Sequence, residues 1–219
     1  MKITYHDVAQ NETIKTYIRK ADETLISLGY TEHSFAHVTK VAKLAGEILL
    51  EAGYSEREAE LARIAGYLHD IGNVINRIDH AQSGAVMAFR ILDQMGAEPE
   101  DIATIITAIG NHDESTAFPV NPVAAALILA DKTDVRYTRV RNQDFASFDI
   151  HDRVNYSVKE SKVVIERDSH IELQIRIETK MCSVMDYFEI FLGRMILCRK
   201  AAEKLGLEFR LNVNGQRLV

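Results

Sequence analysis

A histidine and an aspartate stand side by side where an amphipathic helical pattern ends, in His69-Asp70. Imidazole nitrogens and carboxylate oxygens both coordinate divalent cations such as Mn²⁺, Fe²⁺ and Zn²⁺. Neighbouring residues of a helix point about 100° apart, so both side chains can reach one ion only near the helix end, beside a turn. Gly72 favours such a turn, because glycine readily ends a helix. Three further His-Asp pairs occur in the chain, so the setting distinguishes this one.

Polar residues at expected helix ends or on apolar stripes are candidate metal ligands. They are His37, His69, Asp70, His80, His112 and Asp131. Each alone has a simpler explanation, since a single histidine on an apolar face is more often a hydrogen-bonded core residue than a ligand. Asp131 ends an almost wholly apolar helix, where an unpaired charge is costly and a cation would offset it. Together the six residues predict a divalent-metal site, and the lack of thiol ligands argues against a structural zinc cage.

The order of these residues resembles a known signature. His37, His69-Asp70 and Asp131 are similar to the H…HD…D pattern of the HD-domain superfamily of metal-dependent phosphohydrolases. The resemblance covers about residues 30–142 and extends to the residues that flank the ligands, in segments 37–42, 68–72 and 130–134.

Two further histidines point to a subset of this superfamily. His80 and His112 resemble the extra histidines of branches that hold two metals, which include hydrolases of dinucleoside polyphosphates and of cyclic dinucleotides. Asn73 stands where the cyclic-dinucleotide branch has a lysine, which argues against that subclass. The segment 129–134 followed by Arg136 also resembles the alarmone hydrolases of the stringent response.

The resemblance implies a ligand arrangement and a reaction. Asp70 would bridge two ions, with His37, His69 and Asp131 on one and His80 and His112 on the other. A divalent cation lowers the pKa of its bound water, which makes a nucleophile available at neutral pH. The implied enzyme is a metal-dependent phosphohydrolase that uses one or two Mn, Fe, Mg or Zn ions to cleave a phosphoester or phosphoanhydride. Its substrate would be a nucleotide or other small phosphorylated metabolite.

Two other interpretations remain open. The helical part could be a non-catalytic metal- or nucleotide-binding sensor, with the C-terminal part binding a partner. It could also be a plain helical bundle whose histidines have no common role. The intact set of six ligands favours the enzyme, in which His69 and Asp70 are catalytic.

Several residues near the ligands are candidates for other roles. Lys132, Arg136 and Arg139 are spaced i, i+4 and i+7, so they would share a helix face and bind substrate phosphates if the helix continues that far. The alternative is a solvated basic face. Asp113, next to His112, could relay a proton to the leaving group. We interpret the remaining histidines as surface residues: His6, His33, His151 and His170. Of these, His33 lies one turn before His37 and could line the pocket.

Hydrophobic periodicity predicts a mainly α fold. Apolar residues recur at helical spacing in six segments before residue 145, which are 11–28, 31–53 (with Thr31 as N-cap), 55–69, 80–96, 98–110 and 122–135. Beyond residue 145, segments 163–165, 171–178 and 207–213 read as strands and 182–205 as a helix, whereas 149–161 is ambiguous. We therefore predict a helical HD-type bundle over residues 1–145 and a small α+β domain, an antiparallel sheet plus one helix, over residues 146–219.

Composition limits the partners. A formal net charge of -6 over 219 residues argues against a nucleic-acid polymer as partner. The longest apolar run, residues 123–130, is too short to span a bilayer, and the first residues lack a signal core, so we expect a cytoplasmic protein without a membrane partner. Cys182 and Cys198 are expected to be reduced and buried. The exposed hairpin end of the C-terminal sheet could serve as a homodimer edge.

Overall fold

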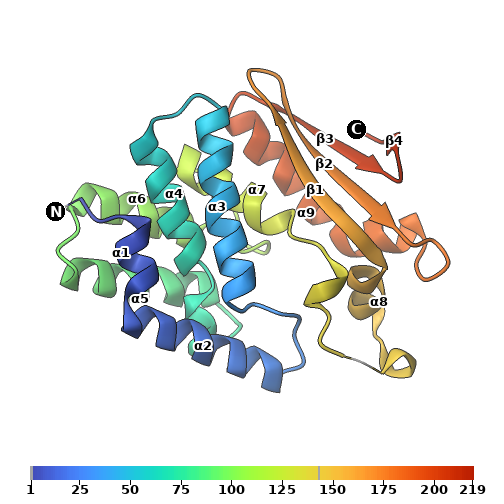
Figure 1. Ribbon diagram of the computed structural model, residues 1–219, viewed down its shortest axis with the longest axis horizontal. Helices are drawn as coiled ribbons and strands as arrows, with labels where there is room; N and C mark the ends of the chain where they lie inside the picture. Colours follow the sequence, from blue (N-terminus) through green and yellow to red (C-terminus); the bar gives the residue numbers. More distant parts are fainter. Residues whose placement is uncertain (1, 143) are drawn as a thin grey trace.

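The computed structural model describes residues 2–142 and 144–219, in which a bundle of helices is followed by a mixed region of helices and strands (Figure 1). The α-helices are α1 (Tyr5–Gln10), α2 (Glu12–Ser27), α3 (Phe35–Glu51), α4 (Glu56–Leu68), α5 (His80–Gln94), α6 (Pro99–Gly110), α7 (Pro122–Lys132), α8 (Ile150–Ser157) and α9 (Val184–Lys204). The 3-10 turns are η1 (Ile71–Val74), η2 (Tyr137–Arg139) and η3 (Phe145–Ser147), and the strands are β1 (Val158–Glu166), β2 (His170–Ile177), β3 (Glu208–Val213) and β4 (Gln216–Arg217). The fold is mainly α with a C-terminal α+β part, as predicted.

Local capping fixes where most helices begin. Ser55 and Glu58 form a capping box at the start of α4, because each side chain accepts a hydrogen bond from the other residue's backbone N–H. Asn121 caps α7 with its side chain, and Pro122 occupies the first turn, where its missing N–H costs nothing. The prediction that Thr31 caps α3 is wrong. Ser34 is the cap, and its hydroxyl accepts from the backbone N–H of Ala36.

Helix α7 lies at the centre of the molecule. Every residue from Val123 to Lys132 is buried, and α7 packs against α3, α4, α6 and α9. Because α7 contacts other elements on all sides, all of its faces are hydrophobic. The same buried cluster continues from the N-terminal helices through α9 into the sheet. The division of the chain near residue 145 into two domains stays a prediction.

The four strands form one sheet in the order β1-β2-β3-β4. Strands β1 and β2 are antiparallel, and so are β3 and β4, but β2 and β3 pair in parallel. The prediction of a purely antiparallel sheet is therefore wrong. Helix α9 connects β2 to β3 and covers one face of the sheet (Figure 1). It returns the chain to the end of the sheet at which β2 begins, so that β3 runs parallel to β2.

The segment that was ambiguous in the sequence contains both kinds of structure. Helix α8 ends at Ser157, and β1 begins at the next residue, Val158. Both residues are fully buried. Over residues 2–142 and 144–219, no helix has the length and apolar character that crossing a bilayer requires.

Candidate metal centre

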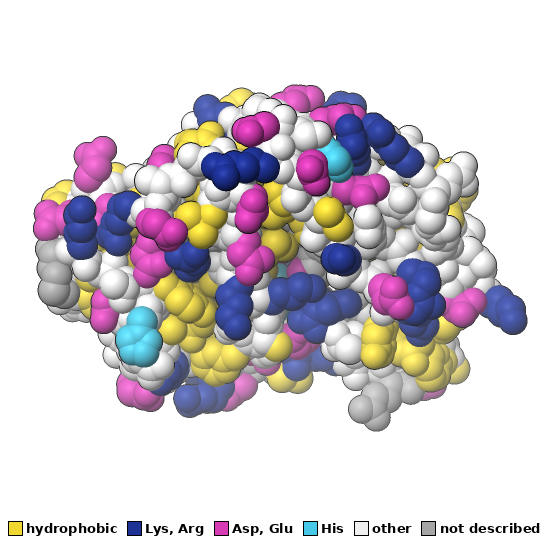
Figure 2. Space-filling model, turned by 45° about the horizontal axis from the view of Figure 1, so that its top comes forward, with side chains coloured by type: hydrophobic (Ala, Val, Ile, Leu, Met, Phe, Trp, Pro, Cys, Tyr) yellow, Lys and Arg dark blue, Asp and Glu magenta, His cyan; other side chains and the backbone are white. Residues whose placement is uncertain are grey.

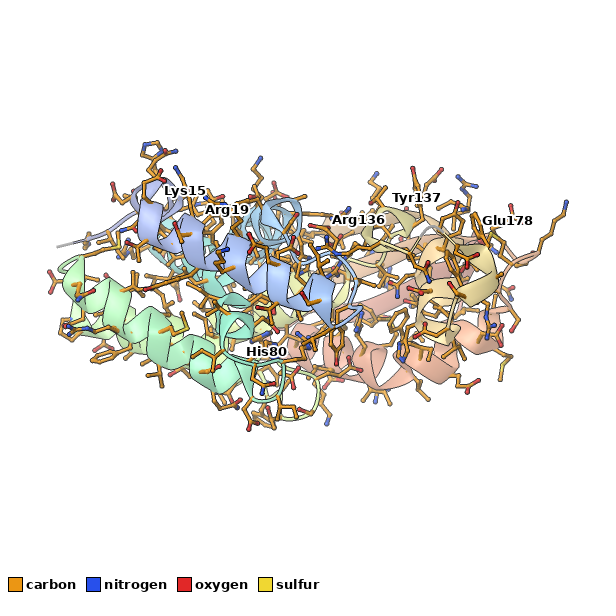
Figure 3. All side chains as sticks on the ribbon, turned by 90° about the horizontal axis from the view of Figure 1, so that it is seen from below. Lys15, Arg19, His80, Arg136, Tyr137 and Glu178 are labelled. Atoms are coloured by element: carbon orange, nitrogen blue, oxygen red, sulfur yellow. The ribbon has the colours of Figure 1, made fainter. Side chains whose placement is uncertain are left out.

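The six side chains predicted as ligands meet at the ends of five helices, and all of them are buried. They are His37 in the first turn of α3, His69 and Asp70 directly after α4, His80 at the start of α5, His112 just after α6, and Asp131 in the last turn of α7. Figure 3, seen from below, shows His80 near the middle of the molecule.

One group of facing atoms belongs to His37, His69, Asp70 and Asp131. The Nε2 atom of His37 lies 3.3 Å from Oδ1 of Asp131 and 3.8 Å from Oδ2 of Asp70. The Nε2 atom of His69 lies 3.2 Å from Oδ2 of Asp70 and 3.7 Å from Oδ1 of Asp131. Two nitrogens and two oxygens therefore face one small space, which suits a single cation.

The other carboxylate oxygen of Asp70 faces a second group. Oδ1 of Asp70 lies 3.5 Å from Nε2 of His80, and that nitrogen lies 3.3 Å from Nε2 of His112. Asn73 donates a hydrogen bond to Oδ1 of Asp70 at 2.9 Å and so orients the carboxylate. Asp70 thus has one oxygen directed towards each group.

Backbone carbonyls fix the orientation of three of the imidazole rings. Nδ1 of His69, His80 and His112 lies 2.8, 3.0 and 2.6 Å from the carbonyl oxygens of Gly66, Arg77 and Ile109, respectively. A carbonyl oxygen can only accept, so each Nδ1 must carry the proton and each Nε2 of a neutral ring is left with a lone pair. The lone pairs of His80 and His112 consequently face each other, with Nη1 of Arg77 3.4 Å from Nε2 of His80, and a cation between the two rings would remove their repulsion.

Two of the inward nitrogens have no partner among the described residues. Nε2 of His37 and Nε2 of His69 are buried without a hydrogen bond. An unpaired buried polar atom is costly, and two of them beside two carboxylates fit a metal ion as the missing partner. Nitrogen and oxygen donors suit Mn²⁺, Fe²⁺, Mg²⁺ or Zn²⁺.

Charges around the centre keep its carboxylates ionised. Burial raises the pKa of Asp70, but His69 and His33 outweigh it and hold that pKa well below its usual value. Burial likewise opposes ionisation of Asp131, whose pKa is nevertheless lowered, chiefly by Lys132. Burial, together with the charge of His69, lowers the pKa of His112 to about 3. His112 is therefore neutral and both carboxylates are ionised, the forms in which these groups bind metals. Burial lowers the pKa of His69, but the charge of Asp70 outweighs it and raises that pKa, so an ion that binds there must displace the proton.

Comparison with known proteins identifies the family. The family model described as "HD domain" matches residues 34–136. Residues 34–136 of the chain form an HD domain. The matched segment contains all six candidate ligands, from α3 to the end of α7.

Individual relatives of the HD-domain protein are distant. It is 34% identical over 83 residues to ribonuclease Y of Latilactobacillus sakei, which is 38% of this chain but only 14% of that relative. It is 23% identical over 197 residues to an uncharacterized protein of Methanocaldococcus jannaschii, covering 80% of this chain and 76% of the relative. A crystal structure of a predicted HD superfamily hydrolase from an uncultured Thermotogales bacterium aligns with a TM-score of 0.45 and 26% identity, over 57% of this chain and 67% of that one.

A cavity of about 370 Å³ opens onto the metal centre of the HD-domain protein. Asp70, His80, His112 and Asp131 form its floor, and the remaining lining comes from the α2–α3 connection, Arg77, Lys132, Arg139, α8 with its N-cap Asp149, and α9. Small-molecule sites typically have volumes of roughly 300–1,000 Å³. The cavity therefore has the size of a site for a small ligand.

The three basic residues predicted to share a helix face do not do so. Helix α7 ends at Lys132, because the chain turns at Thr133 and becomes extended at Arg136. Lys132 and Arg139 line the cavity, whereas Arg136 bonds Asp134 and lies apart from His80 in Figure 3. The expectation of a shared helix face is therefore wrong, because the helix does not continue as far as Arg139. A role for these residues in substrate binding stays a prediction.

Two cavity residues, His33 and His151, were interpreted as surface histidines from the sequence. His33 lies in the connection before α3, with Nδ1 bonded to the carbonyl oxygen of Thr31 at 2.7 Å and Nε2 4.0 Å from Oδ2 of Asp70. Its position one turn before His37 was the only sequence signal for this placement. His151, also interpreted as a surface residue, is exposed but lines the cavity from α8.

Proposed function

We propose that this HD-domain protein is a metal-dependent phosphohydrolase that cleaves a phosphoester or phosphoanhydride. The position of Asp70 carries the proposal, because its two oxygens are directed towards two separate groups of imidazole nitrogens. This arrangement suits a pair of divalent cations that share one carboxylate. His37, His69 and Asp131 would hold one ion with Asp70, and His80 and His112 would hold the other.

Divalent cations bound there would lower the pKa of a coordinated water and offset charge that develops on phosphoryl oxygens. The protein itself supplies orientation and positive charge. Nζ of Lys132 lies 2.7 Å from Oδ2 of Asp131, and Nη1 of Arg77 lies 3.8 Å from Oδ1 of Asp70. Both side chains line the cavity, where they favour an anionic substrate.

Asp113 remains our candidate for protonating the leaving group. Its Oδ1 atom lies 3.9 Å from Nε2 of His80, at the edge of the second ligand group. Its side chain is 25% exposed, which leaves it accessible to solvent for proton exchange.

We propose a nucleotide or another small phosphorylated metabolite as the substrate. The cavity volume of about 370 Å³ and the formal net charge of -6 support a small anion over a nucleic-acid polymer. RNA is the competing substrate, because several relatives are named ribonuclease Y. The aligned segment makes up only 14% of one such relative and 23% of another.

The test is a hydrolysis panel with the Mn²⁺-loaded protein. It contains mononucleotides, nucleoside triphosphates, a dinucleoside polyphosphate, a cyclic dinucleotide and a short oligoribonucleotide. We expect release of product from a small substrate and at least a 100-fold loss of rate in Asp70→Asn and His69→Ala. Asp93→Asn, at an exposed position of α5, is the control and should retain full activity.

The panel also separates the alternatives. A folded, metal-loaded wild-type protein that hydrolyses none of these compounds would contradict the enzyme and favour a sensor. Cleavage of the oligoribonucleotide alone would contradict the small substrate. Elemental analysis that finds no metal after incubation with Mn²⁺ would leave only the plain helical bundle.

A further inference from the structure

Helix α9 contributes an arginine to the cavity from outside the HD-domain segment. Arg194 and Phe191 line the cavity that has Asp70, His80 and His112 at its floor. Both residues belong to α9, more than fifty positions beyond the end of the segment that the HD-domain family model matches. The C-terminal region of the chain therefore forms part of the cavity wall.

Two contacts fix the guanidinium plane of Arg194. Its Nε donates a hydrogen bond to Oε2 of Glu114 at 3.2 Å, and its Cζ lies 4.3 Å from the ring centroid of Phe191. Phe191 is 3% exposed, so the ring is a rigid support. Glu114 follows the ligand His112 by two residues and thus links the loop of the metal centre to α9.

The terminal nitrogens of Arg194 are left available. Neither Nη1 nor Nη2 has a hydrogen-bond acceptor among residues 2–142 and 144–219. A guanidinium whose Nε is already bonded presents these two nitrogens as a fork, which matches two oxygens of a phosphoryl group.

The other three Lys and Arg side chains that line the cavity are each bonded within the protein. Arg77 donates from Nη1 to Oδ1 of Asn73 at 3.2 Å. Lys132 donates to Oδ2 of Asp131 at 2.7 Å. Arg139 donates to two backbone carbonyl oxygens, those of Glu32 and Asp134, each at 2.9 Å. These side chains supply positive charge, but each has a terminal nitrogen bonded inside the protein, whereas neither Nη atom of Arg194 is bonded among the described residues.

We propose that Arg194 binds a phosphoryl group of the substrate through Nη1 and Nη2, and that the C-terminal α+β region thereby completes the active site. This inference rests on the proposed phosphohydrolase function, because it assumes a phosphorylated ligand above the metal centre. Glu114 is a positioning residue that sets the direction of the guanidinium. The ligand class is an anion with two free oxygens on one phosphorus atom.

Inorganic phosphate is the probe for this proposal. Its dissociation constant is measured by calorimetry with the Mn²⁺-loaded protein of 219 residues. Arg194→Gln should weaken phosphate binding ten-fold or more, because both donors are lost. Arg194→Lys should recover part of the affinity, since it keeps the charge but not the fork. Glu114→Gln should weaken binding by a smaller factor, about two- to five-fold.

Controls separate a lost contact from a lost fold. Arg199→Gln, which removes an exposed arginine of the same helix, should leave phosphate binding unchanged. The affinity for Mn²⁺ and the circular dichroism spectrum should be the same in all variants. On any substrate that the wild-type protein hydrolyses, Arg194→Gln should raise KM by a larger factor than it lowers kcat.

The results distinguish this inference from the function on which it rests. Wild-type affinity for phosphate in Arg194→Gln would overturn the role of Arg194, even if the wild-type protein hydrolyses its substrate normally. An equal loss in Arg199→Gln would also overturn it, as would a metal-loaded wild-type protein that binds no phosphate. Failure of the hydrolysis panel with an intact effect of Arg194 on phosphate binding would instead contradict the enzymatic function alone.

Discussion

His37 donates a hydrogen bond from Nδ1 to Oδ2 of Asp134 at 2.8 Å. The side chain of Asp134 is fully buried, and Lys40 donates to its Oδ1 at 2.6 Å. Burial raises the pKa of Asp134, but His37 and Arg139 outweigh it and hold that pKa far below its usual value. Asp134 therefore remains ionised and directs the Nε2 lone pair of His37 towards the metal centre.

Asp134→Asn should weaken metal binding. A carboxylate that accepts from the second nitrogen of a ligand histidine fixes the ring and increases its basicity, so its loss should lower the affinity for Mn²⁺ by about 10- to 100-fold. Calorimetric titration with Mn²⁺ measures this change. Asp93→Asn, an exposed aspartate of α5, is the matched control. Equal affinities in the two variants would show that Asp134 has no effect on the centre.

The two groups of donor atoms around Asp70 should bind separate ions. His80→Ala removes a nitrogen from the second group only, so the protein should retain one tightly bound ion where the wild type holds two. Elemental analysis after dialysis gives the ratio of metal to protein. His6→Ala, at an exposed histidine, should retain both ions. A wild-type protein that holds a single ion would contradict the two-metal arrangement.

Gly72 should not tolerate a side chain. An added Cβ would collide with the backbone oxygen of His80 and would lie 2.5 Å from the backbone nitrogen of Gly84. Gly72→Ala should therefore lower the free energy of unfolding by about 1–3 kcal/mol, as overpacking of a rigid site does. It should also displace His80. Urea unfolding measures the change.

Gly110→Ala is the control for this substitution. Its new Cβ would lie 3.7 Å from Cβ of Ala85, an ordinary contact, and alanine favours a helix by about 1 kcal/mol. Stability should be retained or increased. A loss as large as that of Gly72→Ala would show that close packing is not the cause.

Glu32 should contribute stability that depends on pH. Burial raises its pKa, but hydrogen bonds from Ser34 and the charges of Arg139 and Arg136 outweigh it, so the folded-state pKa is below the usual 4.5. A depressed pKa means that the contribution is complete above about pH 4.5 and is lost as the pH falls through the folded-state value. Glu32→Gln should thus cost about 1–3 kcal/mol at pH 7.

Urea unfolding at pH 7, 5, 4 and 3 tests this dependence. The difference in free energy of unfolding between wild type and Glu32→Gln should shrink below pH 4.5. Glu51→Gln, at an exposed position, should show little difference at any pH. A difference that is constant from pH 7 to pH 3 would mean that the charge of Glu32 does not stabilise the fold.

Helix positions followed closely from the sequence because their signals are local. Ser55 and Glu58 cap α4 with their own side chains, and Pro122 starts α7 by its fixed backbone angle. The end of α7 was misjudged, since apolar residues continue beyond Lys132 while the chain already turns at Thr133. The parallel pairing of β2 with β3 also escaped prediction, because it depends on the path of α9 across the sheet.

The sequence by itself determined which residue types were available as ligands, their order along the chain and the helix ends that carry them. Only the tertiary structure decided which atoms face one another. The carbonyl oxygens of Gly66, Arg77 and Ile109 turn three imidazole Nε2 atoms inward, and those carbonyls are positioned by the ends of α4 and α6 and by the turn before α5, not by any motif. Arg194 reaches the same cavity through the packing of α9 against α7, a contact between segments about sixty residues apart, which no local pattern records.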